Sequence, residues 1–209
     1  MGLRAVVFDY GMVLSGPPDP QAHANLVRIT GLSAERLDSL YWIDRLAYDA
    51  GELTGPEFWR KLIHDAGLSL DDSAIEELNL WDARMWTTVN PAMLAWQQRL
   101  KERGLLTAIL SNLGDTVLAN MQREYDWLPR FDALVWSYQL RMVKPDAAIY
   151  RHTLKALGTR AEETLFIDDR PANIEGARAV GMQGIVFSTV EQLRADLIAA
   201  RLDAQLPLP

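Results

Sequence analysis

The 209-residue sequence contains no cysteine, and this absence excludes several kinds of site at once. Without thiols the chain can form no disulfide, no cysteine nucleophile, no thiolate zinc site and no cysteine-ligated iron–sulfur cluster. Histidine is nearly as scarce, because its three copies (His23, His64 and His152) are scattered and never fall at metal-ligand spacing. Carboxylates, hydroxyls, amides and amines are therefore the groups left for chemistry.

The sequence also lacks an excess of positive charge. Its 21 Lys and Arg against 28 Asp and Glu give a formal net charge of −7, so nothing favours a nucleic acid or an anionic membrane as partner. No apolar run approaches the roughly 20 residues of a membrane-spanning helix. Asp9 also interrupts the first apolar run, where a signal peptide would need its core. We expect a cytoplasmic protein.

Short apolar runs that suit buried parallel strands recur along the chain. They lie at 5–8, 105–110, 134–136, 165–167 and 185–187. Helical patterns separate them, each with proline at or just before its start and glycine after its end, at 91–103, 146–157 and 171–180. Strands that alternate with helices of this length predict an α/β fold with a doubly wound parallel sheet.

Residues 16–86 break this alternation. Helical patterns follow one another there without any strand-like run, near 20–30, 34–49, 55–66 and 72–86. We predict that these residues form a small α-helical cap, inserted into a core made of residues 1–15 and 87–209.

Two further features have structural interpretations. Four of the seven tryptophans lie in the cap, which favours packing between its helices. The alternative is that Trp42, with Tyr41, Arg45 and Tyr48 at helical spacing around it, reaches a substrate. At the C-terminal end, the sequence predicts a helix with a solvated face over 191–201 and a frayed tail over 206–209.

Polar residues stand where the predicted strands end. They are Asp9, Ser111 with Asn112, and Asp168 with Asp169, and Lys144 directly precedes a predicted helix. Ligands of open parallel sheets bind beyond the carboxyl ends of the strands, so we expect these side chains to gather there.

Three carboxylates at one sheet edge repel one another unless a cation offsets them. Oxygen ligands without histidine or cysteine suit Mg²⁺. Lys144 would add a positive charge, Ser111 a hydroxyl and Asn112 an amide, and the helix that begins near Asp115 could aim backbone N–H groups at an anion. Together these groups predict a receptor for a phosphate, with Asp9 placed to attack phosphorus.

In order along the chain, these residues fall in the motifs VVFDYGMVL, AILSN, VKPDAAIY and TLFIDDRPAN. The four motifs resemble those of the haloacid dehalogenase superfamily, phosphatase-like branch, whose helical cap follows the first motif. The resemblance implies that Asp9 is the nucleophile and a Mg²⁺ ligand, and that the carbonyl of Gly11 faces the metal beside the phosphate. It assigns Ser111, Asn112 and Lys144 to the phosphoryl group.

By the same resemblance, Asp168 and Asp169 hold Mg²⁺, and Asn173 supports them from one helical turn further on. The implied activity is that of a Mg²⁺-dependent phosphatase of small phosphorylated metabolites, which acts through an aspartyl-phosphate on Asp9. The competing 2-haloacid dehalogenases need no metal, and they usually lack paired acids such as Asp168 and Asp169.

One position departs from the pattern. Superfamily phosphatases usually carry a second aspartate, the general acid and base, where this chain has Gly11. General acid–base catalysis is worth roughly 10²–10⁴-fold, so three outcomes stay open. The substrate has a leaving group that needs little protonation, such as an anomeric sugar, acyl or aryl phosphate; or a carboxylate from Asp19, Asp44 or Asp49 substitutes; or the protein is a silent phosphate-binding module. Some family members with glycine here look like working sugar-phosphate phosphatases, which favours the first.

Overall fold

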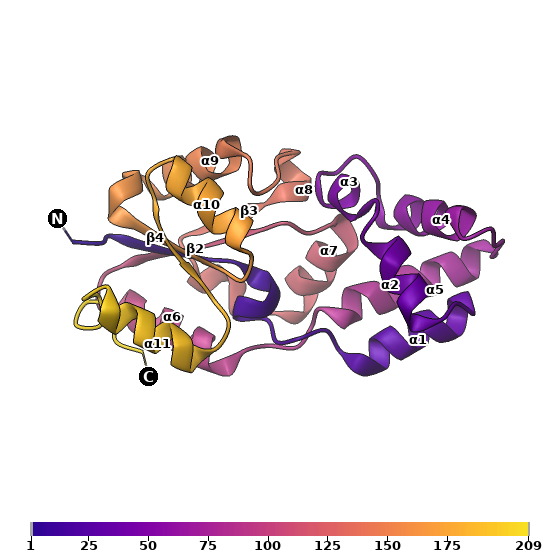
Figure 1. Ribbon diagram of the computed structural model, residues 1–209, viewed down its shortest axis with the longest axis horizontal. Helices are drawn as coiled ribbons and strands as arrows, with labels where there is room; N and C mark the ends of the chain where they lie inside the picture. Colours follow the sequence, from indigo (N-terminus) through magenta and orange to yellow (C-terminus); the bar gives the residue numbers. More distant parts are fainter. Residues whose placement is uncertain (1, 209) are drawn as a thin grey trace.

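The computed structural model describes residues 2–208 and contains a five-stranded sheet (Figure 1). All its neighbouring strands run parallel, in the order β3-β2-β1-β4-β5. The strands are β1 (Ala5–Phe8), β2 (Leu106–Ser111), β3 (Ala133–Trp136), β4 (Thr164–Asp168) and β5 (Gln183–Val186). This confirms the predicted α/β fold with a doubly wound parallel sheet. Phe8 pairs with both Ile109 and Ile167, so Asp9 emerges from the centre of the sheet, level with Asp168.

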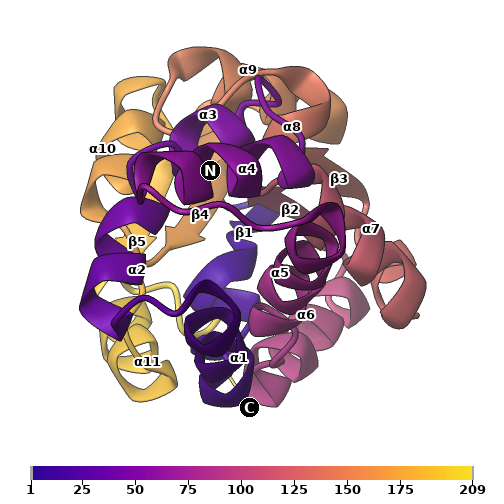
Figure 2. The ribbon, with the colours of Figure 1, turned by 90° about the vertical axis from the view of Figure 1, so that its right-hand side faces the viewer.

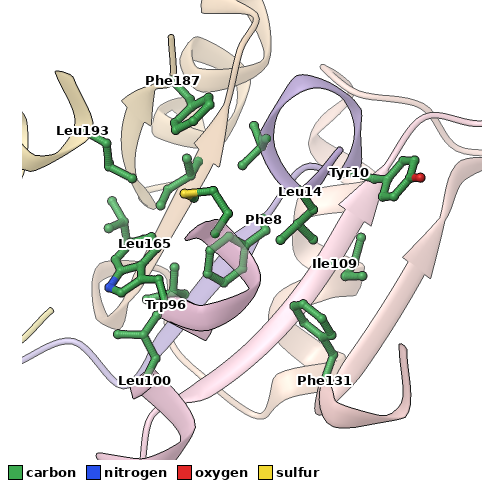
Figure 3. Packing of buried hydrophobic residues seen from close by; sticks show 14 of the residues in the cluster. Phe8, Tyr10, Leu14, Trp96, Leu100, Ile109, Phe131, Leu165, Phe187 and Leu193 are labelled. Atoms are coloured by element: carbon green, nitrogen blue, oxygen red, sulfur yellow. The ribbon is translucent and has the colours of Figure 1, made fainter. Parts of the chain in front are cut away.

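Alternate residues of the central strand serve the two faces of the sheet. Val6 and Phe8 belong to the apolar cluster on one face, and Ala5 and Val7 belong to that on the other. The first face is covered by α6 (Pro91–Glu102), α7 (Asp115–Glu124) and α11 (Val190–Ala199), and the second by α9 (Ala147–Leu157) and α10 (Pro171–Ala179). Phe8 meets the buried Trp96 edge to face, with ring centroids 5.5 Å apart (Figure 3).

Local sequence accounts for where these helices begin and end. Asn90 caps α6 by accepting a hydrogen bond from the backbone of Met93, and Pro91 takes the first helical position. Gly158 ends α9 in the left-handed conformation. Short helical segments complete the core: η1 (Tyr10–Leu14), η2 (Leu128–Arg130), α8 (Ser137–Leu140) and η3 (Ala161–Glu163).

Between η1 and α6 the chain forms helices and no strand, as predicted. They are α1 (Pro20–Thr30), α2 (Ala34–Tyr41), α3 (Arg45–Asp49), α4 (Gly55–Asp65) and α5 (Asp72–Met85). The single helix expected over 34–49 is wrong, because the chain breaks between α2 and α3. Trp42 and Ile43 are largely exposed there, and Asp44 leaves helical geometry and pairs with Lys61 of α4 at 2.9 Å.

These helices share an apolar cluster of their own, separate from those of the sheet. Trp59 lies fully buried in it, and Tyr48 stacks on Phe58 with centroids 5.1 Å apart. The two connections to the core pair with each other through a bridge between Ser15 and Val89. We keep the name cap for residues 16–86; their division from the core stays a proposal that these contacts support.

Gly114, at the start of α7, lies against the Tyr48 ring of the cap. A Cβ atom at this glycine would stand 2.0 Å from Cζ of Tyr48. We therefore expect Gly114→Ala to lower the free energy of unfolding by about 2 kcal/mol, measured by denaturant titration. The double variant Gly114→Ala with Tyr48→Leu should lose less than the sum of its parts, because the smaller side chain relieves the clash. Additive losses would show that the ring does not rest on this glycine.

The C-terminal segment is packed, so the predicted frayed tail over 206–209 is wrong for its described residues. Leu206 is fully buried, and the Gln205 side chain donates to the carbonyl of Leu3 at 2.5 Å and accepts from its backbone N–H. Leu193 and Leu197 bury one side of α11 against the sheet. Pro209 lies outside the described residues. Within residues 2–208, no helix combines the length and apolar character that crossing a bilayer requires.

Candidate active site

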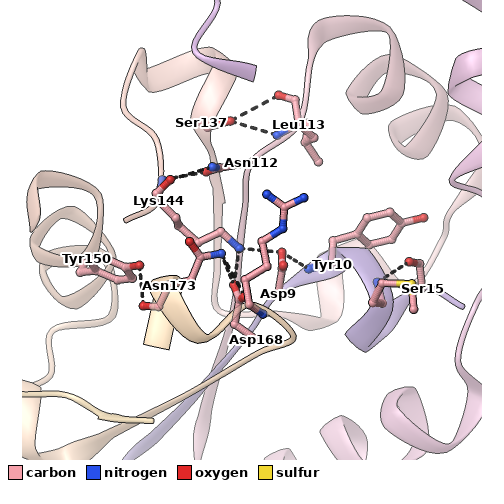
Figure 4. A network of polar contacts seen from close by, with 12 residues as sticks. Asp9, Tyr10, Ser15, Asn112, Leu113, Ser137, Lys144, Tyr150, Asp168 and Asn173 are labelled. Atoms are coloured by element: carbon pink, nitrogen blue, oxygen red, sulfur yellow. Dashed lines mark hydrogen bonds and ion pairs between the residues drawn. The ribbon is translucent and has the colours of Figure 1, made fainter. Parts of the chain in front are cut away.

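A buried lysine joins two aspartates at the carboxyl edge of the sheet (Figure 4). Nζ of Lys144 lies 2.8 Å from Oδ1 of Asp9, at the end of β1, and 2.6 Å from Oδ2 of Asp168, at the end of β4. Only 3% of Lys144 is exposed and none of Asp168. The predicted convergence of these side chains therefore occurs in the structure.

Asp168 is held in place from several directions. Nδ2 of Asn173 donates to both of its carboxylate oxygens at 3.0 Å, and the backbone N–H of Arg170 donates at 2.8 Å. The hydroxyl of Tyr150 in turn donates to the carbonyl of Asn173. Asn173 thus supports this carboxylate as expected, and the carboxylate is fixed before any ligand arrives.

Three carboxylates crowd around this point. One oxygen from each of Asp9, Asp168 and Asp169 can be chosen so that all three lie within 4.8 Å of one another. Burial raises the pKa of Asp9 to about 7 against the opposing effect of Lys144, and Asp168 adds to the rise. Burial also raises the pKa of Asp169, again with a contribution from Asp168. Lys144 and Arg170 oppose these shifts but leave the three carboxylates with an excess of negative charge, so the donor set fits a divalent cation that prefers oxygen, such as Mg²⁺.

Lys144 remains a cation in spite of its burial. Desolvation lowers the pKa of its amine, but the contacts with Asp9 and Asp168 outweigh desolvation and raise the pKa above its usual range. The backbone around it is fixed by Asn112, whose amide accepts from the N–H of Lys144 at 2.8 Å and donates to its carbonyl at 3.0 Å. Asn112 therefore orients the lysine, and its assignment to the phosphate stays a prediction.

The chain makes one wide turn immediately after Asp9. In this segment, η1, the N–H of Ser15 donates to the carbonyl of Tyr10 at 2.7 Å. The backbone of Met12 has φ 59°, a left-handed conformation that is unfavourable for residues other than glycine. The N–H of Met12 donates to Oγ of Ser15. Gly11 has φ −59°, and a Cβ atom there would meet no heavy atom within 4 Å. Space for a side chain therefore exists at the position of the missing acid.

A pocket of about 490 Å³ lies between this edge of the sheet and the cap. Its core side includes most of the residues that the sequence assigned to the site, namely Asp9, Gly11, Ser111, Asn112, Lys144, Asp169 and Asn173. Asp168 lies beneath them without lining the pocket.

Part of the predicted cap contribution also reaches the pocket. Trp42 and Arg45 line it, whereas Tyr41 and Tyr48 are buried within the cap. Of the three acids considered as substitutes for the missing general acid, only Asp49 lines the pocket. Asp19 instead caps α1, and Asp44 pairs with Lys61.

Sequence reasoning missed one charged residue that lines the pocket, Arg170, and one that supports the pocket from within the cap, Asp82. Arg170 stacks on Trp42, with its guanidinium carbon 5.4 Å from the ring centroid, and so links the core to the cap. Its place directly after Asp169 was a usable signal. Asp82 lies within 3.6 Å of Arg45 and accepts from the hydroxyl of Tyr41. No local pattern marks Asp82, because its partners lie about 40 residues away in the sequence.

Comparisons with known proteins agree with this geometry. A family model described as haloacid dehalogenase-like hydrolase matches residues 12–181. Phosphatase MT3486 of Mycobacterium tuberculosis (strain CDC 1551 / Oshkosh) is 29% identical over 204 residues, covering 95% of this chain and 93% of that protein. (S)-2-haloacid dehalogenase 1 of Pseudomonas sp. (strain CBS-3) is 27% identical over 199 residues, covering 91% of this chain and 86% of that protein.

Among solved structures, the HAD family enzyme bt-2542 of Bacteroides thetaiotaomicron, in complex with magnesium and inorganic phosphate, has a similar fold. The two structures superpose over 92% of this chain and 99% of the chain of that enzyme, with a TM-score of 0.75 and 20% sequence identity. That likeness extends over both the sheet and the inserted helices, since it covers nearly the whole of each chain.

Proposed function

The chain belongs to the haloacid dehalogenase-like hydrolases, and we propose that within this family it is a Mg²⁺-dependent phosphatase of small phosphorylated metabolites. The observation that carries the proposal is the grouping of Asp9, Asp168 and Asp169 near the buried amine of Lys144, with Asp9 and Asp169 lining the pocket and Asp168 directly beneath them. The relative named phosphatase and the neighbour that binds magnesium and phosphate support it. Paired acids at 168 and 169 weigh against the metal-free dehalogenase alternative.

In this proposal, Asp9 performs the covalent step. Its carboxylate attacks the phosphorus of the bound ester, an O–P bond forms to Asp9, and the O–P bond to the alcohol breaks. Water then attacks the phosphorus of the aspartyl-phosphate, loses a proton and releases inorganic phosphate and the free Asp9 carboxylate. Lys144 and Ser111 hold the phosphoryl oxygens, and the rigid support of Asp168 keeps the site preorganised.

Asp9, Asp168 and Asp169 would hold the Mg²⁺, together with the Gly11 carbonyl that the family resemblance adds. When bound, this ion supplies the positive charge that lets an anionic nucleophile approach an anionic phosphate. The cap encloses the ester group above this floor. Position 11 supplies no acid, so the departing alcohol is protonated by solvent or by Asp49, or it leaves as the alkoxide and is protonated afterwards. This favours esters whose leaving groups are weak bases.

The test is a panel of sugar, aryl and acyl phosphates, together with 2-chloropropionate, assayed with Mg²⁺ and with EDTA. We expect phosphate release that EDTA abolishes and added Mg²⁺ restores, without chloride release. Metal-independent release of chloride would instead identify a dehalogenase. Binding of Mg²⁺ and phosphate with no turnover on any member of the panel would identify a silent binding module.

A further inference from the structure

Exposed apolar side chains gather at the mouth of the pocket. Of the eight large hydrophobic residues that are exposed within residues 2–208, three line the pocket: Met12, Trp42 and Leu46, with exposed fractions of 41%, 49% and 57%. A fourth, Ile43, follows Trp42 directly in the chain. Water-exposed apolar surface is unfavourable, and its concentration at a binding site indicates that a ligand covers it.

The apolar surface continues from the mouth toward the floor. Trp86, Leu113, Val117 and Val143 also line the pocket and are less exposed than the residues at its mouth. Leu113 directly follows Asn112 and Val143 directly precedes Lys144, so this apolar wall adjoins the residues assigned to the phosphate. An apolar surface at this position is best covered by the organic group of a phosphate ester whose phosphate binds at the carboxylates.

The cap contributes two charged side chains to the pocket, and they are paired with each other. Arg45 and Asp49 are the charged cap residues that line the pocket, and Nε of Arg45 donates to Asp49 at 2.9 Å. The Arg45 guanidinium also lies over the rings of Tyr41 and Tyr48, 5.0 and 5.3 Å from their centroids. Nη1 of Arg45 is buried without a hydrogen bond and lies 3.6 Å from Oδ1 of Asp82. Arg45 and Asp49 offer fewer partners than a sugar with several hydroxyls needs, and each unpaired buried hydroxyl costs free energy.

From these contacts we infer that the substrate is a phosphate ester with an apolar, preferably aryl, organic group that lies against Met12, Trp42 and Leu46. The inference rests on the proposed function. It selects the aryl esters among the sugar, acyl and aryl phosphates that remain possible because Gly11 replaces the general acid. An aryl oxide departs with less need of a proton than an alkoxide, so the missing acid and the apolar wall favour the same class of ester.

Para-substituted phenyl phosphates test the wall at nearly constant leaving-group basicity. With Mg²⁺ present, kcat/KM should rise from phenyl to 4-ethylphenyl to 4-propylphenyl phosphate, by up to about fourfold for each fully buried methylene. The 4-ethyl ester should exceed the similarly sized 4-hydroxymethyl ester by about fivefold or more. A flat series, or a preference for the hydroxymethyl ester, would overturn the inference.

Two exposed cap leucines form a matched pair of variants. Leu46 and Leu80 have similar exposed fractions of 57% and 55%, but only Leu46 lines the pocket. Leu46→Gln should lower the ratio of kcat/KM for 4-propylphenyl phosphate over phenyl phosphate several-fold. Leu80→Gln should keep the wild-type ratio. Equal effects of the two substitutions would exclude Leu46 from the binding surface.

A binding measurement separates this inference from the proposed function. If no ester is hydrolysed, the proposed function is wrong, and the wall can still be tested with phosphonates, which contain no ester bond. Hexylphosphonate should then bind more tightly than ethylphosphonate in the presence of Mg²⁺, followed by the fluorescence of the pocket tryptophans or by calorimetry. Equal affinities, or no binding of either compound, would overturn the inference.

Discussion

Asp9→Asn should lower phosphate release by at least about 10³-fold, with the fold intact. The amide cannot attack phosphorus, and removal of a nucleophile typically costs several orders of magnitude in kcat. Asn has nearly the shape of Asp, so its side-chain oxygen can still accept from the N–H of Tyr10, as Asp9 does at 2.7 Å. Steady-state phosphate release gives the rate. Hydroxylamine trapping should detect an acyl phosphate in the wild-type protein alone.

Asp19→Asn is the matched control. Asp19 caps α1 by accepting from the N–H of Gln21, and Asn caps helices equally well. This variant should keep wild-type turnover. Wild-type turnover in Asp9→Asn instead would remove Asp9 from the reaction and with it the proposed function.

The stability of the same variant provides a second readout. Because burial raises the pKa of Asp9 to about 7, from an ordinary value of 3.8, the folded protein binds this proton more tightly than the unfolded chain. Metal-free protein should therefore lose stability as pH rises from about 4 to about 7. Asn cannot ionise, so the stability of the Asp9→Asn variant should fall less between these two pH values. Added Mg²⁺ should restore stability to the wild-type protein at pH 7 and above.

Gly11→Asp is expected to raise turnover of alkyl phosphates by about 10²-fold, within the 10²–10⁴-fold range of general acid–base catalysis. The backbone at Gly11 is ordinary for any residue, with φ −59° and ψ 131°, and a Cβ atom has open space. The new carboxyl would enter the pocket next to Asp9 and could protonate the departing alcohol. The increase in turnover of 4-nitrophenyl phosphate should be much smaller, because the nitrophenolate leaving group needs little protonation.

Gly11→Asn has the same size and no acidic proton, so it separates acid catalysis from packing. Comparison of kcat for the two variants on both substrates decides the role. Equal rates for Asp and Asn, or a larger gain on the nitrophenyl ester, would show that an acid at this position does not limit the wild-type reaction. A gain from undetectable to measurable turnover would identify the wild-type protein as a binding module.

The core of the site could be predicted because its residues directly follow buried strands. A run such as residues 5–8 fixes a strand, and parallel pairing then brings Asp9 level with Asp168 whatever lies between them in the sequence. The direct contact of Lys144 with both carboxylates could not be predicted, since it depends on the path of the loop before α9. The same holds for Asn112, whose side chain fixes that loop.

The cap was predicted less well for a physical reason. The spacing of Tyr41, Arg45 and Tyr48 continues a helical period across the break at residues 42–44, and all three residues are buried. The helical spacing therefore survives although the chain leaves helical geometry at Asp44, and no pattern of buried residues marks that break. Leu206 escaped prediction in the same way, because its contacts lie at the far end of the chain.

The paired connections at Ser15 and Val89 have a mechanical consequence. They join the cap to the core on one side of the molecule, whereas α3 lies beside α8 on the other (Figure 1 and Figure 2). On that second side, Oγ of Ser137 donates to the carbonyl of Asp49 at 2.6 Å, and Arg170 covers Trp42. Any rotation of the cap about this bridge would have to break these two contacts, together with the hydrogen bond from Gly55 to Asp115 and the contact of Tyr48 with Gly114, while the carboxylates at the strand ends stay fixed.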